Sequence, residues 1–150
     1  MWHKSKQMTK FSIFLVSIII SAGSFGQDGT FSSTDGVAIK GYDPVAYFTE
    51  GKAVKGNDNF SFQWSGSQWK FSSQANLNMF TSDPAKYAPQ YGGFCAYGCS
   101  ENHKSPTDPN AFTIVNKKLY LNYNLKVKEL WITDTTSRIK AADAYWKSLK

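Results

Sequence analysis

The chain has 150 residues, of which 41% are hydrophobic and 16% aromatic, enough for one domain with a substantial core and hardly enough for two. Its formal net charge of +6 comes mainly from scattered lysines, and Arg138 is the single arginine. This pattern disfavours nucleic-acid binding, which calls for a clustered basic surface, and is typical of a solvated surface that carries lysines.

Residues 1–26 have the features of a secretory signal peptide. Three lysines precede an apolar run at 11–20, which is too short for a comfortable membrane span, and small residues follow it up to Gly26. Cleavage after Gly26 would leave 14 basic and 11 acidic side chains, a formal charge of +3. We expect a periplasmic or secreted protein with no stable membrane span after signal removal, the alternative being an uncleaved signal anchor.

The next segments predict a leader, a hairpin and a helix. Residues 27–36 are polar and rich in glycine and serine, which predicts a flexible leader before a domain at 37–150. Apolar and polar residues alternate at 60–64 and 69–71, which predicts a β-hairpin. Ser72 or Ser73 is placed to cap a helix through Phe80, and Asp83-Pro84 begins a further helical turn.

The last third of the chain predicts a second hairpin and closing helices. Two apolar runs, 112–115 and 119–121, flank a polar turn at 116–118. Asn124 is placed to cap a helix at 125–132, and apolar residues recur at helical spacing from Ile139 to Leu149. The predicted fold class is therefore α+β, a small single domain with two β-hairpins packed against short helices and C-terminal helices.

The segment from Cys95 to His103 holds both cysteines and the only histidine beyond His3. Its spacing is C-x3-C-x3-H, its glycines allow the backbone to fold around a centre, and Glu101 and Asp108 lie near enough in sequence to add oxygen. Two thiolates and an imidazole favour Cu(I) or Zn(II), because soft sulfur prefers soft or borderline ions. Cys95, Cys99 and His103 are therefore the candidate metal ligands.

Two other interpretations of the cysteines stay open. In an oxidising envelope Cys95 and Cys99 would pair readily, and a structural disulfide is the first alternative. Free or catalytic thiols are the second, although the spacing differs from the C-x-x-C of thioredoxin-like exchange and from the C-x-x-C-H of haem attachment.

Aromatic side chains around the same segment are candidates for a ligand-facing surface. Tyr91, Phe94 and Tyr97 could stack on a flat ligand, and core packing is the alternative interpretation. Asp43 and Asp83, each before a proline, are interpreted as a turn residue and a helix cap. Because neither resembles half of a catalytic pair and no nucleophile with its base is visible, we expect a protein that is not an enzyme.

Several motifs together resemble the YHS domain family. They are the Trp64 and Trp69 hairpin and the segments at 41–48 (GYDPVAYF), 71–73 (FSS), 83–87 (DPAKY), 91–98 (YGGFCAYG) and 119–124 (LYLNYN). The chain is most similar to the exported, stand-alone branch of that family. The wider family resembles TRASH-type modules, and the resemblance implies a scaffold associated with binding soft metals through cysteines.

The chain departs from the cysteine-bearing members of this family at three positions. Those relatives read DPVCG and FCS-x-x-C, whereas this chain has Ala46, Ser72 and Asn76 at the matching places. Serine and asparagine bind copper or zinc poorly compared with a thiolate, so the usual ligand set does not carry over. Cys99 and His103 go beyond the loop pattern of the stand-alone branch and would give this chain a relocated site.

Three functional hypotheses follow from the sequence. The first is an exported metal-binding protein for copper or zinc that uses the Cys95/Cys99/His103 loop and hands the ion to a metal-transport or redox partner in the envelope. The second is a disulfide-stabilised module that binds another ligand or a protein. The third, a thiol oxidoreductase, has the least support.

Overall fold

The computed structural model describes residues 31–150, so the predicted signal peptide at 1–26 lies outside the described residues. Part of the predicted leader forms β1 (Ser33–Thr34), which pairs antiparallel with β2 (Val37–Ala38) at the start of the predicted domain. The Phe31 ring lies 5.4 Å from the Trp64 ring and 5.1 Å from the Trp69 ring. The segment from residue 31 onward therefore packs against the domain.

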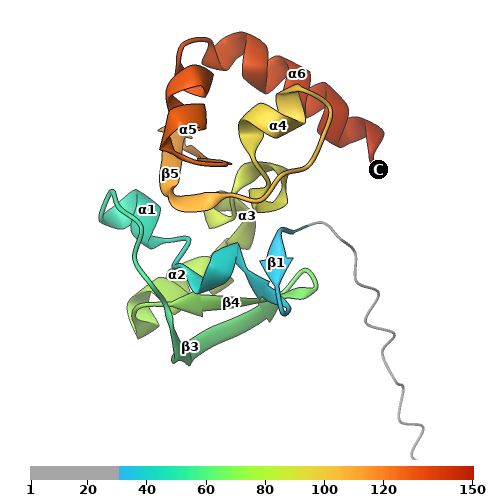
Figure 1. Cartoon of the computed structure of the whole chain (residues 1–150). Helices are drawn as coiled ribbons and strands as arrows, with labels where there is room; N and C mark the ends of the chain where they lie inside the picture. Colours follow the sequence, from blue (N-terminus) through green and yellow to red (C-terminus); the bar gives the residue numbers. More distant parts are fainter. Residues whose placement is uncertain (1–30) are drawn as a thin grey trace, which may run out of the picture.

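The first predicted hairpin is confirmed and belongs to a four-stranded sheet with the order β1-β2-β4-β3 (Figure 1). Strands β3 (Asn57–Trp64) and β4 (Ser67–Phe71) pair antiparallel across a two-residue turn. Ser65 and Gly66 in this turn both have positive φ, the backbone conformation that matches the twist of a tight hairpin.

The second predicted hairpin is also confirmed, as β5 (Asp108–Val115) and β6 (Lys118–Asn122). Its turn residues, Asn116 and Lys117, again have positive φ. The two sheets and the helices around them make an α+β domain, as predicted.

Helices begin where the sequence places capping side chains. The Ser73 hydroxyl accepts a hydrogen bond from Asn76 N, and the Asn124 side chain accepts one from Val127 N. In chain order the helices are α1 (Ala46–Thr49), α2 (Gln74–Ser82), α3 (Pro84–Tyr87), α4 (Ala96–Ser100), α5 (Leu125–Ile132) and α6 (Thr135–Ser148). Sequence patterns predicted α2, α3, α5 and α6, whereas α1 and α4 are single short turns that carry no periodicity.

Strand β6 separates two hydrophobic cores because successive side chains on a strand point to opposite faces. Leu119 and Leu121 join the first core, which includes Trp69, Phe71 and Phe80 from the first sheet and α2. Tyr120 faces the second core, made with Tyr91, Ala96, Cys99, Trp131 and Ala142. In Figure 1 the first core lies among the lower elements, and the second lies among α4, α5 and α6 above them.

Two turns with left-handed backbone conformation pack against each other close to Leu121 of β6. The short helical turns η1 (Ile39–Gly41) and η2 (Gln90–Gly93) each contain three consecutive residues with positive φ. A Cβ on Gly93 would stand 2.9 Å from the Ile39 side chain, so the two turns pack closely only because position 93 has no side chain.

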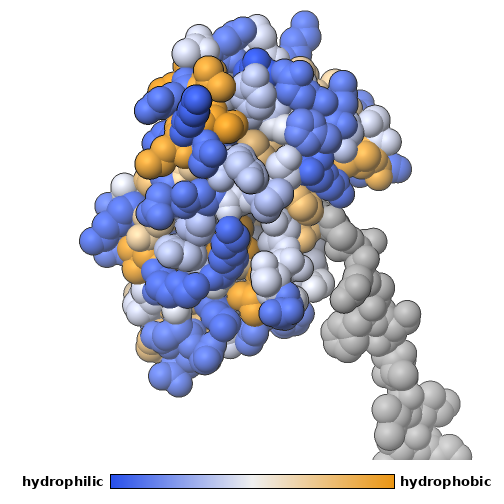
Figure 2. Space-filling model, viewed as in Figure 1, coloured by the Kyte–Doolittle hydropathy of each residue, from blue (hydrophilic) through white to orange (hydrophobic). Residues whose placement is uncertain are grey.

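Some apolar side chains remain on the surface. Leu125, Leu130 and Ile132 of α5 are each about half exposed. Figure 2 shows hydrophobic atoms gathered where Figure 1 places this helix. Among residues 31–150, no helix is both long and apolar enough to cross a bilayer.

Gly56 provides a test of the close approach between the backbone just before β3 and strand β4. A Cβ at this position would lie 2.5 Å from the Lys70 carbonyl carbon, whereas one on Gly51 would have no atom within 4 Å. We expect Gly56→Ala to lower the free energy of unfolding by about 3 kcal/mol through overpacking. The matched Gly51→Ala should cost only about 1 kcal/mol, from its positive φ. Equal shifts of the two denaturant midpoints would contradict this packing.

Tyr47 links α1 to strand β5, and its buried hydroxyl should make the stability of the protein sensitive to alkaline pH. Its hydroxyl donates to Pro109 O at 2.9 Å, and burial, followed by Tyr42, Asp108 and Asp43, raises its pKa above the ordinary value of 10. Above that pH the unfolded chain loses a proton that the folded protein retains, so stability falls by about 1.4 kcal/mol per pH unit for this group.

In Tyr47→Phe this contribution should vanish. Urea unfolding of wild type and variant between about pH 10 and pH 11.5 would show a shallower decline for the variant. At neutral pH the variant should be weaker by about 1 kcal/mol, for the lost hydrogen bond. If the free energy of unfolding falls equally steeply with pH in both proteins, the Tyr47 hydroxyl does not cause the loss of stability at alkaline pH.

Candidate functional site

Cys95 is the N-cap residue of α4 and is almost fully buried. Its sulfur accepts hydrogen bonds from Gly98 N at 3.4 Å and from Tyr123 N at 3.3 Å. It also lies 3.6 Å from Asn122 Oδ1, to which the thiol proton can be donated. The sulfur is therefore held by two backbone donors and one side-chain acceptor.

Asn122 is a site residue that the sequence analysis missed. It ends β6 and is fully buried on the face shared with Tyr120, where its Oδ1 also accepts from Tyr97 N at 3.1 Å. Its Nδ2 has no hydrogen-bond partner among the described residues. The sequence feature that could have indicated it is an asparagine directly after the apolar run at 119–121, since a buried polar side chain needs hydrogen-bond partners.

Cys99 lies one helical turn after Cys95 but in a different environment. It is fully buried in the second core beside Tyr91, Tyr120 and Trp131. Burial, together with the nearby Cys95, raises the pKa of the Cys99 thiol to about 12, so it remains protonated at neutral pH. Both cysteines are free thiols in this structure.

His103 is exposed and folds back over α4. Its Nδ1 lies 3.4 Å from the Glu101 carbonyl oxygen, which can only accept, so this contact requires Nδ1 to carry the proton. In the neutral ring Nε2 then keeps its lone pair, and it lies 3.3 Å from the point where a Cβ on Gly98 would stand. Arg138 binds the Glu101 carboxylate and secures this loop against α6.

The three predicted ligands therefore separate into two groups. Cys95 and His103 line one pocket of about 270 Å³, which Tyr97, Gly98, Ser105, Tyr123 and Val127 complete. Cys99 belongs to the second core instead. Within residues 31–150, no group of three or more histidine, cysteine or acidic side chains is arranged to hold a metal ion.

The three predicted ligand-facing aromatics also occupy different surroundings. Tyr91 is buried, and its hydroxyl donates to Asp143 Oδ1 at 2.8 Å. Phe94 is half-buried beneath the Lys104 ammonium, 5.0 Å from its ring centre. The Arg138 guanidinium lies 4.0 Å from the Tyr97 ring centre and donates to the hydroxyl of this tyrosine as well. Only Tyr97 contributes to the Cys95 pocket.

A second polar centre lies at the positions where the chain differs from the cysteine-bearing members of the family that it resembles. Asp43 is fully buried, and its Oδ1 accepts from Val45 N and Ala46 N at 2.9 and 3.2 Å. Its Oδ2 accepts from Ser72 N, Ser72 Oγ and Asn76 Nδ2 at 2.7 to 2.8 Å. The three positions thus meet in space around one carboxylate, which is satisfied by hydrogen bonds alone.

This arrangement tests whether the family's usual metal position fits an ion in this chain. The donors around Asp43 are amide and hydroxyl groups that point their hydrogens at the carboxylate. A cation would need those groups to turn away, and no thiolate is present to replace them. The residues at this position do not fit a soft metal, and the aspartate acts as a structural hub.

In a comparison with protein-family models, residues 45–91 match the YHS domain. The match includes Ala46, Ser72 and Asn76 and ends before Cys95, so the cysteine loop lies beyond it. No curated protein and no solved structure matches the chain.

The structural role of Asp43 predicts a large loss of stability for Asp43→Asn. Each carboxylate oxygen accepts at least two hydrogen bonds, so an amide group would oppose donors in either orientation. We expect the free energy of unfolding to fall by about 3 kcal/mol, measured by urea denaturation. Asp58→Asn is the control, since Asp58 is exposed and pairs with Lys70, and its loss of stability should be far smaller because solvent screens an exposed ion pair. Similar losses of stability in both variants would show that Asp43 does not act as a structural hub.

Proposed function

We propose that this protein, whose chain carries a YHS domain at residues 45–91, is a non-enzymatic binding protein of the cell envelope that holds a soft metal ion at Cys95 and His103. The observation that carries the proposal is that these two side chains line the same pocket. A thiolate and an imidazole are the ligand types that Cu(I) and Zn(II) prefer.

The surroundings of Cys95 suit a sulfur that becomes a thiolate on binding. Gly98 N and Tyr123 N already donate to it, and hydrogen bonds to a charged form stabilise that form. Binding an ion releases the thiol proton and frees Asn122 Oδ1, which keeps its hydrogen bond from Tyr97 N.

The orientation of His103 supports the same assignment. A metal-binding histidine commonly donates its other ring N–H to a carbonyl or carboxylate, which sets the tautomer and the ring orientation. Here Nδ1 faces the Glu101 carbonyl oxygen, while Nε2 lies beside Gly98 at the pocket that Cys95 also lines.

The position of Cys99 favours copper over zinc. Structural zinc sites almost always have four tetrahedral ligands, and the pocket supplies one cysteine and one histidine. Cu(I) is selected by soft ligands and accepts a low coordination number, so two ligands suffice. An incompletely filled shell also suits transfer, and we propose a metal-transport or redox protein of the envelope as the partner.

The test is a Cu(I) titration of protein exported to the envelope and purified in reduced form, in competition with bathocuproine disulfonate. We expect one equivalent to bind wild type, Cys95→Ser to abolish binding, and His103→Gln to weaken it by at least about tenfold. Cys99→Ala is the matched control and should retain wild-type affinity, because Cys99 belongs to the second core. Zn(II) should bind much more weakly than Cu(I).

Three outcomes would overturn the proposal. If the Cys95→Ser variant binds copper as tightly as wild type does, Cys95 is not a ligand. If the Cys99→Ala protein is folded but no longer binds copper, both thiols are needed. Protein isolated with thiol trapping and found two mass units lighter than the dithiol would show a disulfide, and would favour a module for another ligand.

A further inference from the structure

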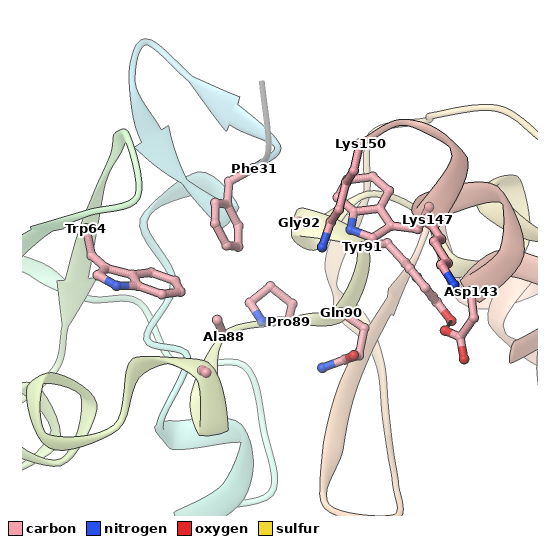
Figure 3. A pocket seen from close by; sticks show the side chains of 12 residues that line it. Phe31, Trp64, Ala88, Pro89, Gln90, Tyr91, Gly92, Asp143, Lys147 and Lys150 are labelled. Atoms are coloured by element: carbon pink, nitrogen blue, oxygen red, sulfur yellow. Dashed lines mark hydrogen bonds between the residues drawn. The ribbon is translucent and has the colours of Figure 1, made fainter. Parts of the chain in front are cut away.

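A separate cleft lies between the first sheet and α6 (Figure 3). Its volume is about 490 Å³, within the range of small-molecule sites. Phe31 and Trp64 form one side, Ala88 and Pro89 lie at the base, and Tyr91 lies on the opposite side. Trp146, Asp143, Lys147 and Lys150 of the chain's last segment complete this second side.

The exposure of the tryptophans distinguishes this cleft from the rest of the molecule. Trp69 and Trp131 are fully buried, as expected for core residues. Trp64 and Trp146 are the other tryptophans of the described residues; both are only partly buried, and both line the cleft. Aromatic surface left partly accessible on two sides of one cavity is a feature of binding sites, because stacking and burial would be gained on occupation.

The two sides are held in place before any ligand arrives. Ser32 N donates to Gly92 O at 2.6 Å, which ties the segment carrying Phe31 to the opposite side of the cleft. Tyr91 has φ 55° and ψ 34°, a left-handed conformation that costs an aromatic residue energy, and its hydroxyl is bound to Asp143. A preformed site reduces the entropy lost on binding.

The charges at the cleft indicate the polarity of the ligand. Lys147 and Lys150 are exposed and lie at its edge, whereas the Asp143 carboxylate already accepts from Tyr91. Gln90 adds one amide. A sugar would call for many convergent hydrogen-bonding groups, whereas this lining combines four aromatic side chains with small residues and a cationic edge.

We propose that this cleft binds a small planar aromatic molecule that carries a carboxylate or similar anionic group. The ring lies against Trp64 and Trp146, and the anion pairs with Lys147 and Lys150. The site is independent of the Cys95 pocket, with which it shares no lining residue.

The test uses 1-naphthoate as the probe and follows the indole N–H signals of the intact protein by NMR. We expect saturable shifts of the Trp64 and Trp146 signals, with the Trp131 signal nearly unchanged because that ring is in the second core. Two matched probes separate the requirements. 1-Naphthylmethylammonium has the ring with the opposite charge, and cyclohexanecarboxylate has the anion without the flat ring, so both should bind at least about tenfold more weakly.

Charge reversal on α6 and at the end of the chain tests the cationic edge. The double variant Lys147→Glu, Lys150→Glu should weaken 1-naphthoate binding by about tenfold or more. Lys140→Glu is the matched control, since Lys140 is exposed on the same helix outside the cleft, and it should bind as wild type does.

Each contrary result overturns the proposal. Absence of shifts up to about 10 mM would show that the cleft is not a site for this class. Equal binding of the cationic probe, or full binding by the double variant, would remove the anion preference. Equal binding of cyclohexanecarboxylate would remove the requirement for a planar ring.

Discussion

The alternation of side chains along β6 is the constraint on which the rest of the structure depends. Leu119 and Leu121 point into the first core, while Tyr120 and Asn122 point toward α4 and the second core. A shift of one residue in register would place the Asn122 amide among aliphatic and aromatic side chains without partners, which is far costlier than any surface change. The same alternation brings Asn122 to Cys95, so the strand that divides the cores also positions the cysteine.

Asp43 and Cys95 are both buried acceptors that receive backbone N–H groups, but they differ in how completely they are satisfied. The Asp43 carboxylate accepts five hydrogen bonds and connects α1, β4 and α2 into one unit. The Cys95 sulfur accepts two and lines an open pocket with His103. The first centre is thus closed to a ligand and stabilises the domain, whereas the second leaves a sulfur whose proton an ion can replace.

Elements whose signals lie within a few residues were predictable. The first hairpin follows from alternating apolar and polar residues, and the second from two apolar runs on either side of a short polar turn. Asn124 caps α5, as its position before an apolar helical segment indicates. The short helix α4 was missed, since one turn has no periodicity. So were the left-handed turns at 39–41 and 91–93, where Ile39 and Tyr91 hold positive φ that sequence propensity disfavours and tertiary packing imposes.

The sequence by itself determined the fold class, the main strands and helices, and the absence of thiols from the usual ligand positions of the family that the chain resembles, because these depend on residue types and local spacing. Only the tertiary structure decided which side chains meet. Tertiary packing brought Ser72 and Asn76, which are 29 and 33 residues away in sequence, into hydrogen-bonding contact with Asp43. It also buried the Cys99 side chain in the second core, while Cys95 and His103 line a common pocket. The separation of Cys99 from Cys95 and His103 cannot be predicted from the C-x3-C-x3-H spacing, since which way a side chain on a short helix points depends on the strands and helices packed around it.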